Sequence, residues 1–217
     1  DGRFYSPARL RGKHRFTDLD IFVELPALGK IIKKEKGDTG IIERTTWQEG
    51  SIFRVIDSDD DIFNDGRLTP SILICDDSSG EHYEMADFVA IQTGDKKGIA
   101  LIHAKNGSGA GSLSVGNLHE VVSQAKKNLG VFDPSEDLPD TLARKWNGVW
   151  KTGKKTLSRI RRPTTGALKG REIVNALSEL RSHPATEKEV WLVLGNMFGK
   201  REITEVITSS GKVEYHW

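Results

Sequence analysis

The chain has 217 residues, of which 36% are hydrophobic and 29% are charged, and its formal net charge is +1. This is the composition of a globular protein with enough apolar material for a core. It contains no run near the roughly 20 apolar residues of a membrane span. Cys75 is the only cysteine, which excludes a disulfide framework and a cysteine-based zinc site. We therefore expect a cytoplasmic protein with no membrane partner.

The N-terminal region is basic. The first fifteen residues hold six Arg, Lys or His, and the chain opens on Asp1. We predict that it is a piece of a longer protein. Residues 1–40 would form an N-terminal extension that packs on a domain spanning residues 41–217.

Three strand-like runs follow a less regular segment. Residues 41–57 favour a helix over part of their length, because their apolar residues recur at near-helical spacing. The runs at 71–77, 86–92 and 98–105 are joined by short connections with Gly, Asp and Ser. Short connections of this kind predict an antiparallel meander.

The second half of the chain alternates helices with further strands. Residues 114–132 predict a helix with an apolar stripe formed by Leu118, Val122, Ala125 and Leu129. A basic insertion at 133–188 contains an amphipathic helix at 171–183, and a buried strand follows at 189–195. The expected class is mixed α/β.

The second and third runs of the meander place polar residues at one end of an apolar face. Side chains alternate faces along a strand. With a three-residue turn at 95–97, Asp87 lies opposite Lys105 and Val89 lies opposite His103. An acid, an imidazole and an ammonium would then meet where the apolar face ends.

The preceding run ends in two further acids, so this edge of the sheet is expected to gather Asp76, Asp77, Glu84 and Asp87 with His103 and Lys105. Clustered carboxylates repel one another unless a cation lies among them, and oxygen ligands favour Mg²⁺. A neighbouring lysine can orient water or stabilise charge on a phosphate. The simpler interpretation makes the Asp pair turn residues, Lys105 a surface lysine and His103 a structural histidine.

Four stretches carry a family resemblance: "CDDSSGEHYEMADFVAIQ", "LIHAK", "NLHEVVSQAKKNLG" and "EVWLVLG". An Asp opening one strand and an x-Lys motif closing the next resemble the PD-(D/E)xK, or restriction-endonuclease-like, nuclease superfamily. More narrowly, the stretches resemble nuclease domains attached to bacterial helicase or restriction-type defence proteins. The resemblance covers about residues 41–132 plus the strand at 189–195, and it implies an αβββαβ core.

The resemblance implies cleavage of DNA phosphodiester bonds with Mg²⁺ or Mn²⁺. Asp87 would bind metal, with Asp77 as a neighbouring ligand, and Lys105 would position the attacking water. His103 stands where the motif has an acid. Mg²⁺ rarely accepts imidazole, whereas Mn²⁺ tolerates nitrogen better. His103 would therefore bind a softer metal, hold a metal-bound water or mark a weakened site.

The same resemblance implies roles for two further residues. Gln124 matches the glutamine that several branches of the superfamily place beside the metal or the scissile phosphate. The competing interpretation makes it part of the solvated face of a surface helix. Glu49 is the candidate for the upstream acid, with Glu43 nearly as good.

Residues 141–171 contain no Asp or Glu and ten Lys or Arg. Such a segment is typical of a phosphate-binding surface. Trp146 and Trp150 would stack on bases or anchor the segment in the core. The residues expected to bind nucleic acid are Lys127, Arg144, Lys145, Lys151, Lys154, Lys155, Arg159, Arg161 and Arg162.

Three functions follow as hypotheses. The first is a metal-dependent DNA endonuclease domain that acts on double- or single-stranded DNA. Its partner would be the rest of a larger helicase- or ATPase-linked protein. The second is a nucleic-acid-binding domain of the same fold without cleavage, and His103 is the feature that separates it from the first. The third is a protein-interaction module whose acidic edge caps a partner.

Overall fold

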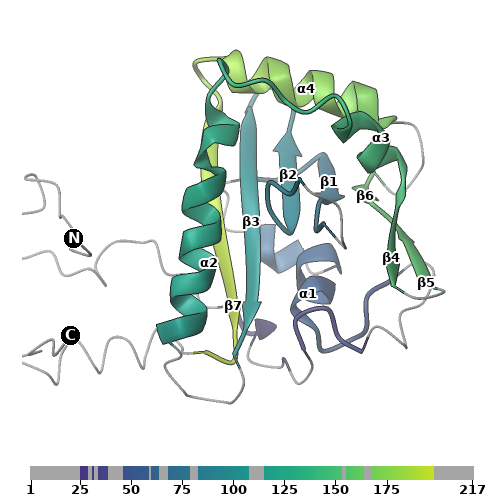
Figure 1. Ribbon diagram of the computed structural model, residues 1–217, viewed down its shortest axis with the longest axis vertical. Coiled ribbons are helices and arrows are strands. Elements are labelled where there is room, and N and C mark those ends of the chain that lie inside the picture. Colours follow the sequence, from purple (N-terminus) through teal and green to yellow (C-terminus); the bar gives the residue numbers. More distant parts are fainter. Residues whose placement is uncertain are drawn as a thin grey trace, which may run out of the picture.

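The computed structural model describes residues 25–28, 31, 34–38, 46–58, 60–63, 68–78, 83–107, 115–152, 155–163 and 168–197. It is a mixed α/β fold (Figure 1). Its elements are α1 (Ile52–Ser58), η4 (Asp60–Phe63), β1 (Ile72–Cys75), β2 (Phe88–Gln92), β3 (Gly98–Asn106), α2 (Val115–Asn128), η5 (Leu129–Phe132), α3 (Leu142–Asn147), β4 (Val149–Thr152), β5 (Lys155–Ser158), β6 (Ile160–Arg162), α4 (Gly170–Ser182) and β7 (Glu187–Gly195).

Five strands form the main sheet in the order β6-β1-β2-β3-β7, and β4 and β5 form a separate hairpin. β6, β1, β2 and β3 pair antiparallel, whereas β7 pairs parallel with β3. A parallel pair needs a long crossover, and here that connection carries α2 and the basic insertion, which includes α4. The predicted meander and the late strand at 189–195 are thus confirmed as parts of one mixed sheet.

Helices cover both faces of this sheet, which explains why β1, β2 and β3 are apolar on both sides. On one face α1 packs Ile52, Phe53 and Ile56 against the strands. α3 and α4 cover the other face, where Trp146, Ile173, Leu177 and Leu180 contact the strand residues. In Figure 1, α2 runs alongside β3 and β7, and α4 crosses one end of the sheet.

The β2–β3 hairpin differs from the predicted pairing by two residues. Val89 lies opposite Leu101, not His103, and the last pair is Gln92 with Gly98. The turn therefore has five residues, 93–97. It contains Gly94, whose φ of +110° suits glycine. Because side chains alternate with a period of two, a shift of two keeps every residue on its predicted face. Continuing the register places His103, rather than Lys105, opposite Asp87.

The helix predicted at 114–132 is divided in the structure. α2 ends at Asn128 and a 3₁₀ turn, η5, follows. Among the described side chains of α2, Val121 and Ala125 are buried and Leu118 and Val122 are half-buried, whereas Leu129, in η5, is 49% exposed. The predicted apolar stripe is therefore confirmed at Ala125, only partly buried at Leu118 and Val122, and wrong at Leu129. The helix is turned so that an i, i+4 pair with a small residue faces the sheet.

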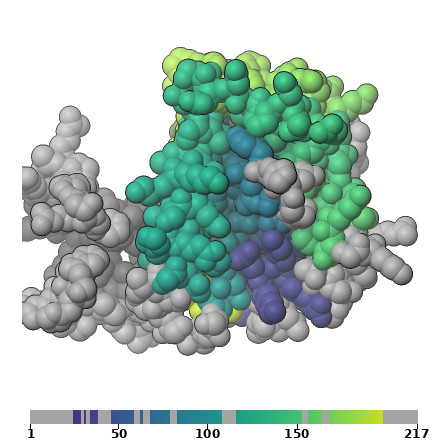
Figure 2. Space-filling model, viewed as in Figure 1, coloured from purple at the N-terminus to yellow at the C-terminus, as the bar shows by residue number. Residues whose placement is uncertain are grey.

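The basic insertion is part of the fold rather than an arm outside it. β6, which it contains, pairs with β1 at the edge of the sheet, where Arg162 lies opposite Leu73. In Figure 2, α2 lies on one side of the face and the green segment with β4 and β5 lies on the other, with blue residues visible between them. Across the described ranges, no helix is long and apolar enough to cross a membrane.

Candidate metal centre

The candidate site lies where β1 ends and β2 begins. Asp76 and Asp77 follow directly after β1, and Asp87 directly precedes β2. The carbonyl of Asp87 accepts hydrogen bonds from the backbone N–H groups of Asp76 (2.9 Å) and Asp77 (3.2 Å). Antiparallel pairing therefore brings the two acidic segments together, as the sequence predicts.

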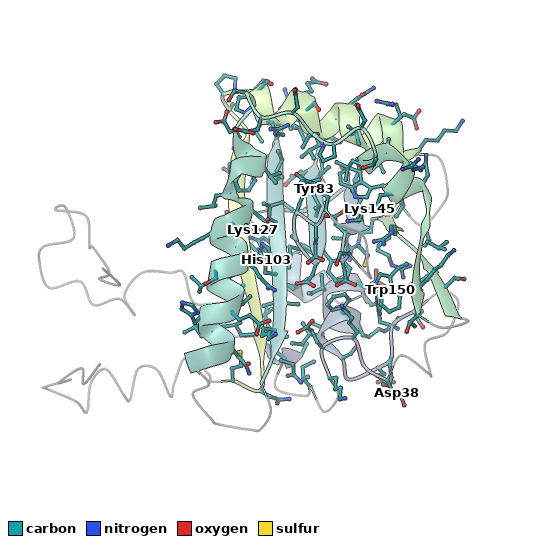
Figure 3. All side chains as sticks on the ribbon, viewed as in Figure 1. Asp38, Tyr83, His103, Lys127, Lys145 and Trp150 are labelled. Atoms are coloured by element: carbon teal, nitrogen blue, oxygen red, sulfur yellow. The ribbon has the colours of Figure 1, made fainter. Side chains whose placement is uncertain are left out.

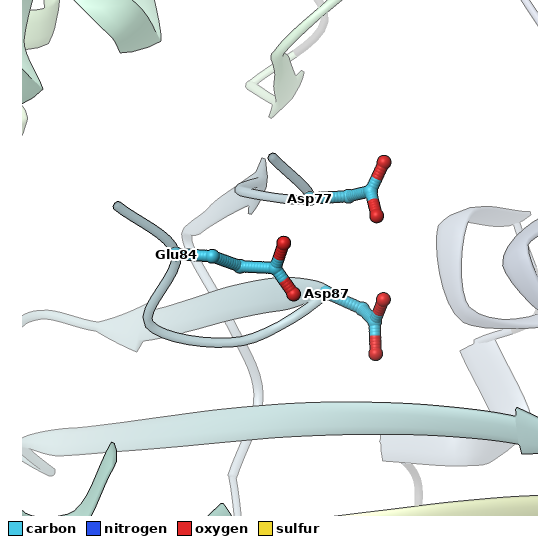
Figure 4. A group of neighbouring side chains, drawn as sticks. All are labelled: Asp77, Glu84 and Asp87. Carbon is cyan, nitrogen blue, oxygen red and sulfur yellow. The ribbon is translucent and has the colours of Figure 1, made fainter. Parts of the chain in front are cut away.

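Three carboxylates converge at this point. One oxygen from each of Asp77, Glu84 and Asp87 lies within 4.8 Å of the others (Figure 4). Asp77 and Asp87 are buried and Glu84 is half-buried. Carboxylate oxygens in such a group are the donors that Mg²⁺, and also Mn²⁺, accept in proteins. We refer to Asp77, Glu84 and Asp87 as the carboxylate cluster.

The surroundings of the Asp87 carboxyl disfavour its ionised form. Burial raises its pKa well above the usual value, and the hydrogen bond from the Ala104 N–H (2.8 Å) opposes that rise. The negative charges of Glu35, Asp77 and Glu84 raise the pKa further. An ionised Asp87 is thus unfavourable without a cation. A bound divalent ion would offset both the cost of burying the Asp87 charge and the repulsion from the neighbouring carboxylates.

Asp77 is held by two donors from distant parts of the chain. Lys36 Nζ lies 2.6 Å from its Oδ1, and Trp150 Nε1 donates to its Oδ2 at 2.6 Å. Glu84 is oriented differently, because its Oε2 accepts the backbone N–H of Ser78 at 2.7 Å. The cluster therefore has fixed carboxylate positions before any ligand is added.

Asp76, expected at the same edge, faces the other side of the sheet. Its side chain is fully buried and binds Lys145 Nζ (2.9 Å), Trp146 Nε1 (2.7 Å) and the backbone N–H of Met85 (2.8 Å). Burial raises the pKa of Asp76, and the Lys145 charge opposes that rise most strongly. Alternation along β1 explains the difference, since Asp76 and Asp77 leave the strand on opposite faces.

His103 and Lys105, on β3, have different environments. His103 is buried, and its Nε2 atom has no hydrogen-bond partner. Burial lowers its pKa to about 4, so the imidazole is neutral near pH 7. Lys105 Nζ lies 2.8 Å from Glu120 Oε1 on α2. Among the described residues, the cluster of possible metal ligands contains neither His103 nor Glu49.

Glu35 is a fourth acid near the cluster, and sequence reasoning missed it. Burial raises its pKa, while the charges of Lys36 and Lys105 and a hydrogen bond from the Asn106 backbone lower it. Glu35 also acts on the pKa of Asp87, as described above. Glu49, the predicted upstream acid, is exposed in a turn before α1, and Glu43 lies outside the described residues. No periodicity or motif marks the turn that contains Glu35.

Gln124 and Lys127 are both exposed on α2. Gln124 lies one helical turn after Glu120, the residue that pairs with Lys105. The side chain of Gln124 itself is exposed to solvent. Lys127 lines an open depression of about 250 Å³ together with Tyr83 and Arg181. The structure thus places these two residues along a helix beside the site, outside the carboxylate cluster.

The basic insertion directs several of its charges inward. Lys145 Nζ donates to the carbonyls of Asp76 and Tyr83, each at 2.6 Å. Arg159 is buried, and its NH1 donates to the carbonyls of Cys75 (3.2 Å) and Asp77 (2.7 Å). These two side chains hold the acidic ends of the strands and are not placed to meet a phosphate.

The other residues predicted to bind nucleic acid differ in their surroundings, since some are paired within the fold and others are exposed. Arg161 forms a paired contact with Asp57, at 2.8 and 2.6 Å, and the Arg162 guanidinium lies over the Phe63 ring at 5.1 Å. Arg144 and Lys151 are exposed. Lys154 lies outside the described residues, as does the side chain of Lys155.

Trp146 and Trp150 are buried, which confirms the core-anchor interpretation over stacking on bases. Trp150 packs edge-on against Trp47, with ring centroids 4.8 Å apart. Figure 3 shows Lys145 and Trp150 toward the β4–β5 hairpin and Lys127 on α2. The indole N–H groups reach Asp76 and Asp77 because both tryptophans come from the insertion, which folds over the end of β1.

No protein-family model matches the sequence, and comparisons with curated proteins and with solved structures find no match. The structure itself defines the class of the chain, which is a mixed α/β protein with a carboxylate cluster at one end of its sheet.

Replacing Glu35 should weaken metal binding, whereas replacing Glu49 should not. In Glu35→Gln a negative charge near Asp87 is lost, and we expect Mn²⁺ affinity to fall about tenfold. Glu49→Gln is the matched control, because Glu49 is exposed and outside the cluster. Isothermal titration with Mn²⁺ measures both. Equal affinities for the two variants would contradict a role for Glu35.

Proposed function

We propose that the chain is a divalent-metal-dependent nuclease domain that hydrolyses DNA phosphodiester bonds. The observation that carries this proposal is the carboxylate cluster, in which three carboxylate oxygens lie within 4.8 Å of one another beside the hairpin strand that bears Lys105. An acid that opens one hairpin strand and a lysine that closes the next also form the pattern that resembles PD-(D/E)xK nucleases. The ion we propose is Mg²⁺ or Mn²⁺.

Asp77, Glu84 and Asp87 would hold the ion. A bound divalent ion supplies positive charge to phosphate oxygens and makes water more acidic. The protein's own contribution is to keep the three carboxylates fixed, through the bonds from Trp150, Ser78 and Ala104. A ligand set held in place before binding costs little reorganisation during the reaction.

Lys105 would orient the attacking water or stabilise the phosphate charge. Its ammonium is held by Glu120 at 2.8 Å and is accessible, with 21% of the side chain exposed. Exposed Lys127, Arg144 and Lys151 would contact the DNA backbone, which favours weak sequence preference. The parent protein would supply a helicase or other ATPase, as in restriction-type defence systems.

The first experiment measures cleavage of plasmid and single-stranded DNA in Mg²⁺ and, separately, in Mn²⁺. Lys105→Met should reduce the rate about a hundredfold, because a charge aimed at the reacting phosphate is lost. Its stability should change by less than about 1 kcal/mol, since the pair with Glu120 is partly exposed. Lys126→Met, on the exposed side of α2, is the control. Unchanged cleavage by Lys105→Met would contradict the assignment of Lys105.

His103 supports a second candidate function, a DNA-binding domain of the same fold that does not cleave. It stands where the motif has an acid, and it lies outside the carboxylate cluster. DNA binding without cleavage in either metal would favour this second function. Cleavage in Mn²⁺ or Mg²⁺ that is lost in Asp87→Asn would favour the nuclease.

A further inference from the structure

We propose that Lys36 is a tethered cation that takes the place of a second metal ion, so that the carboxylate cluster binds a single divalent ion. This inference rests on the proposed metal-dependent function and deepens it. It concerns how many ions the site holds and which residue supplies the remaining positive charge.

The ammonium of Lys36 lies among acids rather than in solvent. Nζ is 2.6 Å from Asp77 Oδ1 and 5.4 Å from the centre of the Phe53 ring, and 28% of the side chain is exposed. The 2.6 Å contact is a direct ion pair between the Lys36 ammonium and a carboxylate of the cluster. Lys36 therefore places a positive charge at the acidic site.

The backbone positions Lys36 through a fixed turn. Gly37 has a φ of +77°, and its N–H donates to the Lys34 carbonyl at 2.9 Å. The carbonyl of Glu35 accepts the N–H of Phe53, at the start of α1, at 3.1 Å. A Cβ added at Gly37 would lie 2.7 Å from Gln48 Cβ, so the turn is also tightly packed. The turn thus connects Lys36 rigidly to α1.

Asp77 accepts one donor at each oxygen, from Lys36 at Oδ1 and from Trp150 at Oδ2, so each oxygen keeps one lone pair with which it could contact a single ion. In two-metal sites the ions lie about 3.5–4 Å apart and share ligands. A second ion beside Asp77 would have to displace the Lys36 ammonium. Glu84 and Asp87 each engage one oxygen with a backbone N–H, which leaves their other oxygen for one ion.

The number of Mn²⁺ ions bound per chain tests this inference, measured by equilibrium dialysis and by electron paramagnetic resonance of free Mn²⁺. We expect one ion for the wild-type protein. Lys36→Gln, which keeps a donor for Asp77 but loses the charge, should bind a second ion. It should also bind the first about tenfold more tightly. Lys36→Arg keeps the charge and should bind one ion.

Lys34→Met is the matched control, because Lys34 is exposed in the same turn, and it should bind one ion. Thermal unfolding of each variant confirms that it is folded before the titration. Two ions per wild-type chain would overturn the inference. So would Lys36→Gln with one ion at unchanged affinity.

Binding and cleavage are separate readouts. One ion per chain without DNA cleavage contradicts the nuclease and supports the role of Lys36. Cleavage with two ions per wild-type chain contradicts the role of Lys36 and supports the nuclease. A wild-type chain that binds no Mn²⁺ overturns both.

Discussion

Asp87→Asn should abolish DNA cleavage and, in metal-free buffer at neutral pH, make the fold more stable. The loss of cleavage should be about a thousandfold or more, because the ion contributes several kcal/mol of charge stabilisation. The asparagine keeps an oxygen to accept the Ala104 N–H, so the local backbone is retained. The same substitution removes a buried carboxylate whose ionisation is unfavourable.

The pH dependence gives the sign of the stability effect. Burial raises the folded-state pKa of Asp87, with a further contribution from Glu35, Asp77 and Glu84. A carboxyl with a raised folded-state pKa contributes stability at low pH and loses it as pH rises from the unfolded-state pKa through the folded-state pKa. The advantage of Asp87→Asn should therefore be small near pH 4 and grow toward neutral pH.

Urea unfolding with and without Mn²⁺ measures both effects. At a concentration one hundred times its dissociation constant, an ion that binds the folded state alone stabilises it by about 2.7 kcal/mol. We expect this gain in the wild-type protein and its loss in Asp87→Asn. Asp140→Asn, an exposed acid far along the chain, is the control and should retain the gain. An Asp87→Asn variant that Mn²⁺ still stabilises would contradict Asp87 as a ligand.

Lys145→Met should destabilise the protein by about 3–5 kcal/mol, which is the usual cost of breaking a buried ion pair by removing one partner. The substitution leaves the fully buried Asp76 carboxylate without its counter-ion. It also leaves the carbonyls of Asp76 and Tyr83 without the donor that binds them at 2.6 Å. Arg144→Met, at the exposed neighbouring position, should stay within about 0.5 kcal/mol of wild type.

DNA binding distinguishes this structural role from the phosphate contact predicted from the sequence. A phosphate contact would lower affinity across all sequences and reduce the salt dependence of binding, with the fold unchanged. We expect folded Lys145→Met to bind DNA as the wild-type protein does, when measured well below its melting temperature. A stable variant with weaker, less salt-dependent binding would instead support the phosphate contact.

The local sequence pattern was sufficient to predict the strands and one part of the site. Short apolar runs joined by turn residues identified β1, β2 and β3, and a late apolar run identified β7. The alternation of side chains along a strand placed Asp87 and Lys105 on one face, although the pairing was two residues out. That error came from the turn, where Gly94 lengthens the connection in a way that side-chain periodicity does not record.

Only the tertiary structure determined which residues bind the carboxylates of Asp76 and Asp77. Lys36 meets Asp77 across 41 residues, and Trp146 and Trp150 reach the two acids across 70 and 73. Composition had suggested that the acidic and basic segments serve a metal and a nucleic acid separately. In the folded chain much of the basic segment neutralises or binds the acidic one, because a buried charge is stable only when paired. Partners so far apart carry no local pattern, so Glu35 and Lys36 appear at the site only when the chain is folded.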